Sequence, residues 1–189
     1  TQGAIGEITA FHSSENVVYH HYVAAFVRGK WNRRDTSNPM QLAKCCHDLD
    51  LLTWMFSGQA PVKVASFGSQ KQFRKENAPA GSTPRCLNGC ALVDTCPYSA
   101  KIQYLDQDLW PQYAWEYIHH IPNPTREQKA ESLSTDNPLG RCVWHCDNEV
   151  VDHQTLIVEF EKGATASHNL LCAAARATRT MHLLGSKGG

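Results

Sequence analysis

Apolar and polar residues alternate in several short stretches of the chain, which is the pattern of β-strands with one buried face. In the clearest stretch, Leu156, Val158 and Phe160 alternate with residues 155, 157 and 159. Residues 161–163 supply a turn and residues 164–172 return, so the pattern predicts a hairpin. Further strands are predicted at residues 4–11, 17–27, 62–67 and 179–184, with a polar turn at residues 13–16.

A helical repeat replaces this alternation between Met40 and about Phe56. Asn38 is a good N-cap, Pro39 suits the first helical position, and Gly58 supplies the stop. The apolar residues of this repeat, predicted to face the core, are Leu42, Cys45, Leu49, Leu52 and Phe56. A second helix is predicted near residues 126–133, and the Pro-, Gly- and Cys-rich residues 74–99 are predicted to be irregular. Several antiparallel strands and one long early helix favour an α+β fold.

The composition excludes some classes of function. Lys and Arg together number 18 and balance 18 Asp and Glu, so there is no electrostatic case for binding nucleic acid or an anionic membrane surface. No apolar run is long enough to span a bilayer. Nothing at Thr1 resembles a signal peptide and no initiator Met is present, so we expect the chain to begin inside a longer protein. With no secretory signal, the eight cysteines are expected to be reduced thiols in a cytoplasmic protein.

Three residues of the predicted helix could transfer protons. Lys44, His47 and Asp48 follow one another at i, i+3 and i+4 and are predicted to share one face. Clustered in this way, they could tune one another's protonation and act as acid or base. The plainer interpretation is a surface ion pair between Lys44 and Asp48 beside a histidine that merely packs, and spacing alone favours it.

The residues around this helix form a longer string. FVRGKWNRRDTSNPMQLAKCCHDLDLLTWM, at residues 26–55, resembles the glucose–fructose oxidoreductase, inositol dehydrogenase and MocA-like (Gfo/Idh/MocA) family. The resemblance covers nearly the full chain. It includes GEI at 6–8, RCV at 141–143, CDN at 146–148, VDHQ at 151–154, EFE at 159–161 and LGSKG at 184–188.

The resemblance implies a two-domain enzyme. Residues 1–189 would be part of its C-terminal domain, a large open, mostly antiparallel sheet with helices on one face that often mediates homo-oligomers. The N-terminal Rossmann domain, which binds NAD or NADP, would be missing from this chain, since no G-x-G-x-x-G is present. The implied reaction is hydride transfer between the nicotinamide and a hydroxyl carbon of a sugar or polyol.

Alignment on the family's D-x-G-x-H motif places His47 at the catalytic histidine. Ala43 stands where the family has Asp, and Cys45 where it has Gly. This departure leaves Lys44 as a residue that could compensate. It also keeps open two alternatives: an NAD-dependent glycosidase of the same family, and a catalytically inactive domain for binding or oligomerisation.

Two polar groups outside the helix are candidates for binding the substrate. Arg28, Trp31 and Asn32 lie in the loop before the helix, where the family draws substrate contacts, and offer a donor fork and a stacking face. A second group, suited to hydrogen-bonding a polyol, lies just before the hairpin: Asp147, Asn148, Asp152 and His153. The plainer interpretations are loop packing for the first group and turn or edge capping for the second.

Three cysteines in the irregular segment are a candidate structural zinc site. Cys86, Cys90 and Cys96 are spaced C-x3-C-x5-C, and the fourth ligand could be Cys142, His145 or Cys146. The spacing is not a standard zinc motif, so free thiols in a reducing cell are the competing and favoured interpretation.

Overall fold

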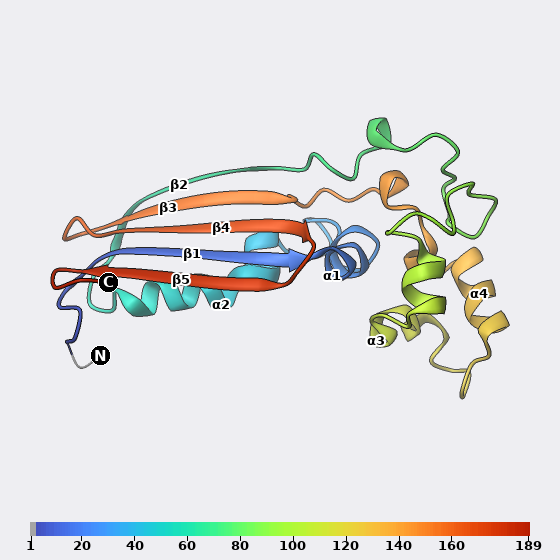
Figure 1. The fold of residues 1–189 in the computed structure, drawn as a ribbon, viewed down its shortest axis with the longest axis horizontal. Coiled ribbons are helices and arrows are strands. Elements are labelled where there is room, and N and C mark those ends of the chain that lie inside the picture. The colour runs from blue at the N-terminus through green and yellow to red at the C-terminus, as the bar shows by residue number, and fades with distance from the viewer. Residues whose placement is uncertain (1–2) are drawn as a thin grey trace. The chain divides into compact units, whose positions relative to one another are not determined.

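A five-stranded sheet is the main element of the computed structural model, which describes residues 3–189 (Figure 1). Its strands are β1 (Ile8–Val18), β2 (Pro61–Ser69), β3 (His153–Phe160), β4 (Thr165–Ala174) and β5 (Thr178–Gly185), in the order β2-β3-β4-β1-β5. β2 with β3, β3 with β4, and β1 with β5 are antiparallel. β1 and β4 lie side by side and point the same way, so the sheet is mixed but mostly antiparallel, as predicted.

The chain divides into two compact units. The sheet unit comprises the chain up to Val17, Pro39–Ser69 and Val151–Gly189, and the insert unit comprises Val18–Asn38 and Gln70–Val150. The sheet unit therefore consists of three chain segments separated by the two segments of the insert unit.

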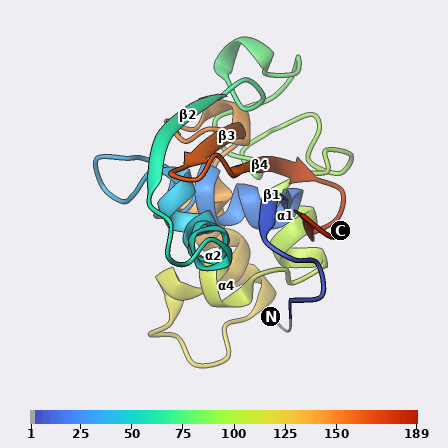
Figure 2. The same ribbon diagram turned by 90° about the vertical axis from the view of Figure 1, so that its left-hand side faces the viewer.

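Helix α2 (Met40–Met55) covers one face of the sheet (Figure 2). The predicted alternation of β3 is confirmed, because Leu156, Val158 and Phe160 are buried against the helix. The rings of Phe56 and Phe160 lie 4.4 Å apart at the centre of this core. The buried members of the core are Phe11, Leu52, Phe56, Leu156, Val158, Phe160, Ala164 and Ala166.

The end of α2 agrees with the prediction, but the predicted direction of its side chains is only partly confirmed. Gly58 follows the helix with φ +90, a conformation that other residues rarely adopt, as expected of a stop. Leu42 was predicted to face the core, but 56% of it is exposed, whereas Asp48 is fully buried. The reason is that the sheet offers charged partners to the helix, so a carboxylate can be buried in an ion pair where an apolar residue was expected.

Helical turns replace the second predicted strand. β1 runs straight through the predicted turn at 13–16 and ends at Val18, and α1 (Tyr19–Tyr22) and a π-helix (Val23–Val27) follow. Ser13 and Glu15 look like turn residues but are buried in the strand. Residues 23–27 are all buried, so they lack the alternating exposure of a half-buried strand.

The insert unit is built from short helices and loops. Its α-helices after α1 are α3 (Pro111–Ala114) and α4 (Arg126–Ser134), and a second π-helix spans Lys101–Asp106. α4 is the predicted second helix, and a capping box between Thr125 and Gln128 fixes its start. The 3-10 turns of the insert unit are Lys75–Asn77, Glu116–Ile118, Pro138–Gly140 and Val143–His145. Residues 74–99 are irregular apart from one such turn, as predicted.

Candidate functional site

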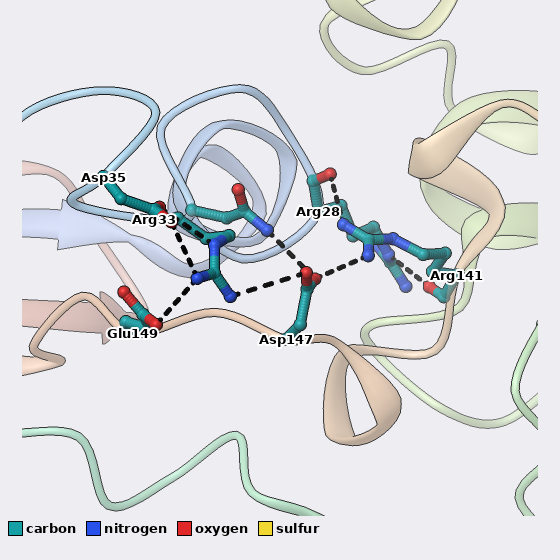
Figure 3. Close-up of polar contacts among 7 residues, drawn as sticks. Arg28, Arg33, Asp35, Arg141, Asp147 and Glu149 are labelled. Carbon is teal, nitrogen blue, oxygen red and sulfur yellow. Dashed lines mark hydrogen bonds and ion pairs between the residues drawn. The ribbon is translucent and has the colours of Figure 1, made fainter.

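Polar side chains from two distant segments of the insert unit meet in one cluster (Figure 3). We call this group the charged cluster; its members are Asn32, Arg33, Asp35, Arg141, Asp147 and Glu149. A backbone hydrogen bond joins the two segments directly, because the amide of Glu149 donates to the carbonyl of Asn32 at 2.8 Å. The main chain itself therefore sets the spacing of the cluster.

Asp147 lies at the centre of the charged cluster. Its carboxylate accepts hydrogen bonds from Nη1 of Arg141 at 2.7 Å and from Nδ2 of Asn32 at 3.2 Å. Nη1 of Arg33 lies 3.9 Å from its other oxygen. The hydrogen bond from Arg141 is the main reason that the pKa of Asp147 lies below its usual range. Asp147 is thus a fixed carboxylate that is ionised at neutral pH and still partly open to solvent.

Arg33 links Asp147 to two further carboxylates. Its Nη2 lies 2.9 Å from Asp35 and 3.1 Å from Glu149. The hydrogen bonds from Arg33 also lower the pKa of Asp35. Positive and negative groups consequently alternate along the cluster from Asp35 to Arg141.

The charged cluster borders an open hollow of about 430 Å³. Asn32, Arg33, Arg141 and Asp147 lie on its wall, and further lining residues are Arg28, Gly29, Lys30, Thr36, Tyr117, Asp136 and Pro138. A small ligand with many hydroxyl groups fits such a wall, because each hydroxyl can both donate and accept a hydrogen bond. Exposed ion pairs add little stability, so stability alone does not account for this concentration of charge.

Arg28 lines this hollow, but its side chain is held inside the insert unit by hydrogen bonds. Its side chain is only 1% exposed. Nε donates to the carbonyl of Arg141 at 2.6 Å, Nη2 donates to the carbonyl of Tyr98, and Nη1 donates to the hydroxyl of Tyr104 at 3.3 Å. The prediction that Arg28 offers its donor fork to a substrate is therefore wrong, because the fork is used inside the unit.

Asn148 directly follows Asp147 in the chain. It is 7% exposed, yet neither Nδ2 nor Oδ1 has a hydrogen-bond partner within residues 3–189. An unpaired buried amide costs roughly 1–3 kcal/mol, so such a group is expected to have a use. Trp31, which precedes Asn32 in the sequence, packs edge-on against Tyr113, and the Lys30 ammonium lies 5.0 Å from its ring centre. These contacts leave less of the predicted stacking face free.

The helix residues predicted to cooperate are separated on α2. Nζ of Lys44 lies 2.8 Å from Glu15, and Asp48 binds Arg179 at 2.6 Å, both on the sheet-facing side. His47 is exposed on α2. The predicted shared face and the Lys44–Asp48 pair are both wrong, since β1 and β5 supply closer partners of opposite charge.

His153 begins β3 and has both ring nitrogens engaged. Nδ1 lies 2.6 Å from the carboxylate of the buried Asp152, and Nε2 lies 3.2 Å from Oγ of Ser69. Because Nδ1 faces a carboxylate, the ring orientation is fixed while part of the side chain remains exposed.

The cysteines predicted to bind zinc line a cavity, but they are not arranged as metal ligands. Cys86, Cys90, Cys96 and Cys142 line one small cavity, but Nη2 of Arg28 points at Sγ of Cys86 from 3.6 Å. Burial raises the pKa of Cys96 and raises that of Cys142 to about 11, so both are protonated thiols at neutral pH. Within residues 3–189, the ligand atoms of this set do not gather as metal ligands would. The geometry does not support zinc here.

Sequence reasoning missed several residues that the structure places in polar clusters. Arg33, Arg141 and Glu149 were not selected, nor were Glu15 and Arg179 in the sheet unit. The mostly basic run Arg-Arg-Asp at 33–35 and the acidic run Cys-Asp-Asn-Glu at 146–149 were visible in the sequence as two groups of opposite charge. Nothing in the sequence links two runs more than a hundred residues apart.

The mixed open sheet covered by one long helix defines an α/β domain. A family model, described as "Oxidoreductase family, C-terminal alpha/beta domain", matches residues 1–189. The chain therefore belongs to the Gfo/Idh/MocA oxidoreductase family. Within the part of the chain that the structure describes, no helix is long and apolar enough to cross a membrane.

Solved structures with a similar fold include three inositol dehydrogenases. One is the scyllo-inositol dehydrogenase of Lactobacillus casei with bound NAD(H) and scyllo-inositol, 17% identical with a TM-score of 0.48. The others are the myo-inositol 2-dehydrogenase of Lactobacillus plantarum (15%, TM-score 0.49) and a putative myo-inositol dehydrogenase of Sinorhizobium meliloti 1021 (13%, TM-score 0.48). The matches cover 99% of this chain but only 34%, 34% and 33% of those chains, respectively. Comparison with curated proteins finds no match.

Proposed function

We propose that this chain is the substrate-side domain of an NAD(P)-dependent oxidoreductase that acts on a sugar or polyol. The observation that carries the proposal is the ionised, fixed and partly open carboxylate of Asp147 beside the hollow. Membership of the oxidoreductase family supplies the class of reaction. The substrate would give up a hydride from a hydroxyl carbon and a proton from its oxygen.

The substrate contacts of this proposal lie mainly in the charged cluster. Asp147 accepts a hydrogen bond from one substrate hydroxyl, and Asn32 is held beside it at 3.2 Å. The unpaired amide of Asn148 offers both a donor and an acceptor, which matches a second hydroxyl. Trp31 is a further candidate contact through the part of its ring that Tyr113 and Lys30 leave free. His153, in the sheet unit, is a separate candidate through the exposed part of its side chain.

His47 is the proposed base. Oxidation of an alcohol requires a group that takes the hydroxyl proton, and an imidazole has the right pKa for that work near neutrality. Lys44 and Asp48 act through the helix in this proposal. Their ion pairs to Glu15 and Arg179 hold α2 against the sheet and so fix the place of His47.

The cofactor requires another part of a longer protein. The chain has no G-x-G-x-x-G turn, and nothing in its sequence forms a phosphate cradle. NAD or NADP would accept or return the hydride, and its binding would fall to an N-terminal dinucleotide-binding domain outside this chain.

The sheet face opposite α2 is the proposed contact between copies. Register places Phe67 and Ile157 on that face, and Leu171 and Leu184 share it. Phe67 is 79% exposed, and the other three are about half exposed. Exposed apolar side chains spread over a sheet face are typical of a protein interface.

Steady-state kinetics of the enzyme that contains this domain test the substrate site. Asp147→Asn keeps the shape of the side chain but removes the charge, so KM for the polyol is expected to rise roughly tenfold or more. Asp94→Asn, a surface acid paired with Lys101, is the matched control and should leave KM unchanged.

Three results would contradict the proposal. An unchanged KM in Asp147→Asn would place the substrate elsewhere. Free sugar released without net NADH would identify the NAD-dependent glycosidase instead. Failure of the wild-type enzyme to turn over any polyol with NAD or NADP would favour a binding or oligomerisation domain.

A further inference from the structure

The polar layer between α2 and the sheet contains more than ion pairs. Cys45 and Asp48 lie on the sheet-facing side of α2, and His168 lies on the helix-facing side of β4. All three are buried, and Sγ of Cys45, a carboxylate oxygen of Asp48 and a ring nitrogen of His168 lie within 4.8 Å of one another. They are the one such group within residues 3–189.

His168 has one nitrogen that nothing else explains. Its side chain is fully buried, Nδ1 lies 2.9 Å from Oγ of Ser13, and Nε2 has no partner in the described part of the chain. Oγ of Ser13 also reaches the carbonyl of Ser167 at 3.3 Å. If the serine donates to that carbonyl, Nδ1 carries the proton and donates to the serine. Nε2 then presents a bare lone pair, the arrangement found in metal-binding histidines.

We infer that Cys45, Asp48 and His168 form a binding site for one divalent transition-metal ion of the zinc type. Binding of the ion would displace the proton of the buried Cys45 thiol to solvent, and the resulting thiolate, the imidazole and the carboxylate are the ligands that such an ion prefers. They would fill three positions of a tetrahedron. Bonds of about 2.0–2.3 Å require the three ligand atoms to close around the ion, which side-chain rotation provides. The site goes beyond the function proposed above, with which it shares Asp48 and its partner Arg179, and it is tested by metal binding rather than by turnover.

Arg179 is the natural competitor for this site. It binds Asp48 at 2.6 Å, and it is also held by Glu15 at 3.1 Å. Nη2 of Arg179 also donates to the second oxygen of Asp48 at 3.3 Å, so an ion would displace this longer hydrogen bond while Arg179 keeps its contact with Glu15. Lys44, bound to Glu15 at 2.8 Å, completes the set of charged neighbours. Without Arg179, Asp48 would be fully available to the ion.

Cobalt(II) binding to the purified protein tests the site, because a cobalt–thiolate bond gives a near-ultraviolet charge-transfer band. The wild-type protein should bind one equivalent of cobalt(II) and show this band. Cys45→Ser and His168→Gln should each abolish the band and weaken binding more than roughly a hundredfold, beyond what loss of an outer partner costs. Ser13→Ala should weaken binding roughly 10–100-fold. Arg179→Gln should strengthen it.

Two variants control for the other thiols. Cys46→Ser changes the exposed neighbour of Cys45 and should leave the band intact. Cys90→Ser tests the other group of cysteines and should also leave it intact. A band that survives in Cys45→Ser, that vanishes in Cys90→Ser, or that never appears in the wild-type protein would overturn the inference. Circular dichroism confirms the fold of each variant, and Arg179→Gln gives an answer even if a ligand variant unfolds.

Discussion

Single residues in this chain acquire their roles from partners far away in the sequence. Arg28 looks like an exposed loop arginine in the sequence, but it is buried among acceptors from residues 98, 104 and 141. Asp48 looks like a surface acid but is buried against Arg179. Residue type and local spacing are enough to predict that these positions are polar, and they do not reveal which partners decide whether the position is open or closed.

Replacement of Arg28 should destabilise the protein. Arg28→Met leaves two carbonyls and the hydroxyl of Tyr104 without their donor, and Arg28→Lys cannot reproduce the planar fork. We expect each to lower the free energy of unfolding by about 2–4 kcal/mol, measured by urea denaturation. Arg34→Met, at an exposed arginine nearby, should change it by less than about 0.5 kcal/mol. Wild-type stability in Arg28→Lys would show that the fork is not required.

His47 is the residue proposed to take the proton from the substrate hydroxyl. In the enzyme that contains this domain, His47→Ala should lower kcat by roughly a hundredfold or more, with a smaller effect on KM. The fold should survive, because the side chain is exposed. His120→Ala, at another exposed histidine, serves as the control. Near-normal turnover in His47→Ala would mean that the base belongs to another residue, and an unfolded variant would mean that His47 packs into the structure.

At the scale of elements, sequence periodicity predicts which helices and strands form better than it predicts which of their faces is buried. The hairpin, the strands at β2 and β5, and helices α2 and α4 all follow from local pattern and capping residues. The second predicted strand fails because a run of buried apolar residues carries no period, and the long-range packing around Val23–Val27 decides its conformation. The sequence suggested Asn32, Asp147 and Asn148 as candidates for the site. The contacts of Asp147 with Arg33 and Arg141 could not be predicted, because they depend on a fold that brings two loops together.

The facing of α2 can be measured directly. Leu52 is buried in the core against the sheet, so Leu52→Ala should cost about 2–5 kcal/mol of unfolding free energy. Leu42 is mostly exposed, so Leu42→Ala should cost less than about 0.5 kcal/mol. Both changes keep a good helix former, which makes the pair a matched test by chemical denaturation. Equal losses would show that Leu42 packs against a surface as Leu52 does.

At the scale of the whole molecule, the chain contains the proposed substrate site but no G-x-G-x-x-G turn that would hold a dinucleotide. We therefore expect the purified chain to show no saturable micromolar binding of NADH, because no glycine-rich turn before a helix is present to hold the pyrophosphate. Energy transfer from the five tryptophans to NADH is the measurement. The same titration of an enzyme with its dinucleotide-binding domain is the positive control. Tight binding to the chain alone would place part of the cofactor site within residues 1–189.

The pairing of β1 with β5 has a consequence for how the protein is made. Ile8 lies opposite Gly185 and Asn16 opposite Thr178, so this edge of the sheet joins the two ends of the described chain. Closing so long a loop costs entropy before any contact rewards it, and folds rich in such distant pairings form slowly. During synthesis β1 must wait until β5, at residues 178–185, has left the ribosome. Until then the backbone edge of β1 is unpaired, and the side chains of Phe11 and Val17, which are buried in the folded protein, are exposed. β1 is therefore the segment that a chaperone would need to shield.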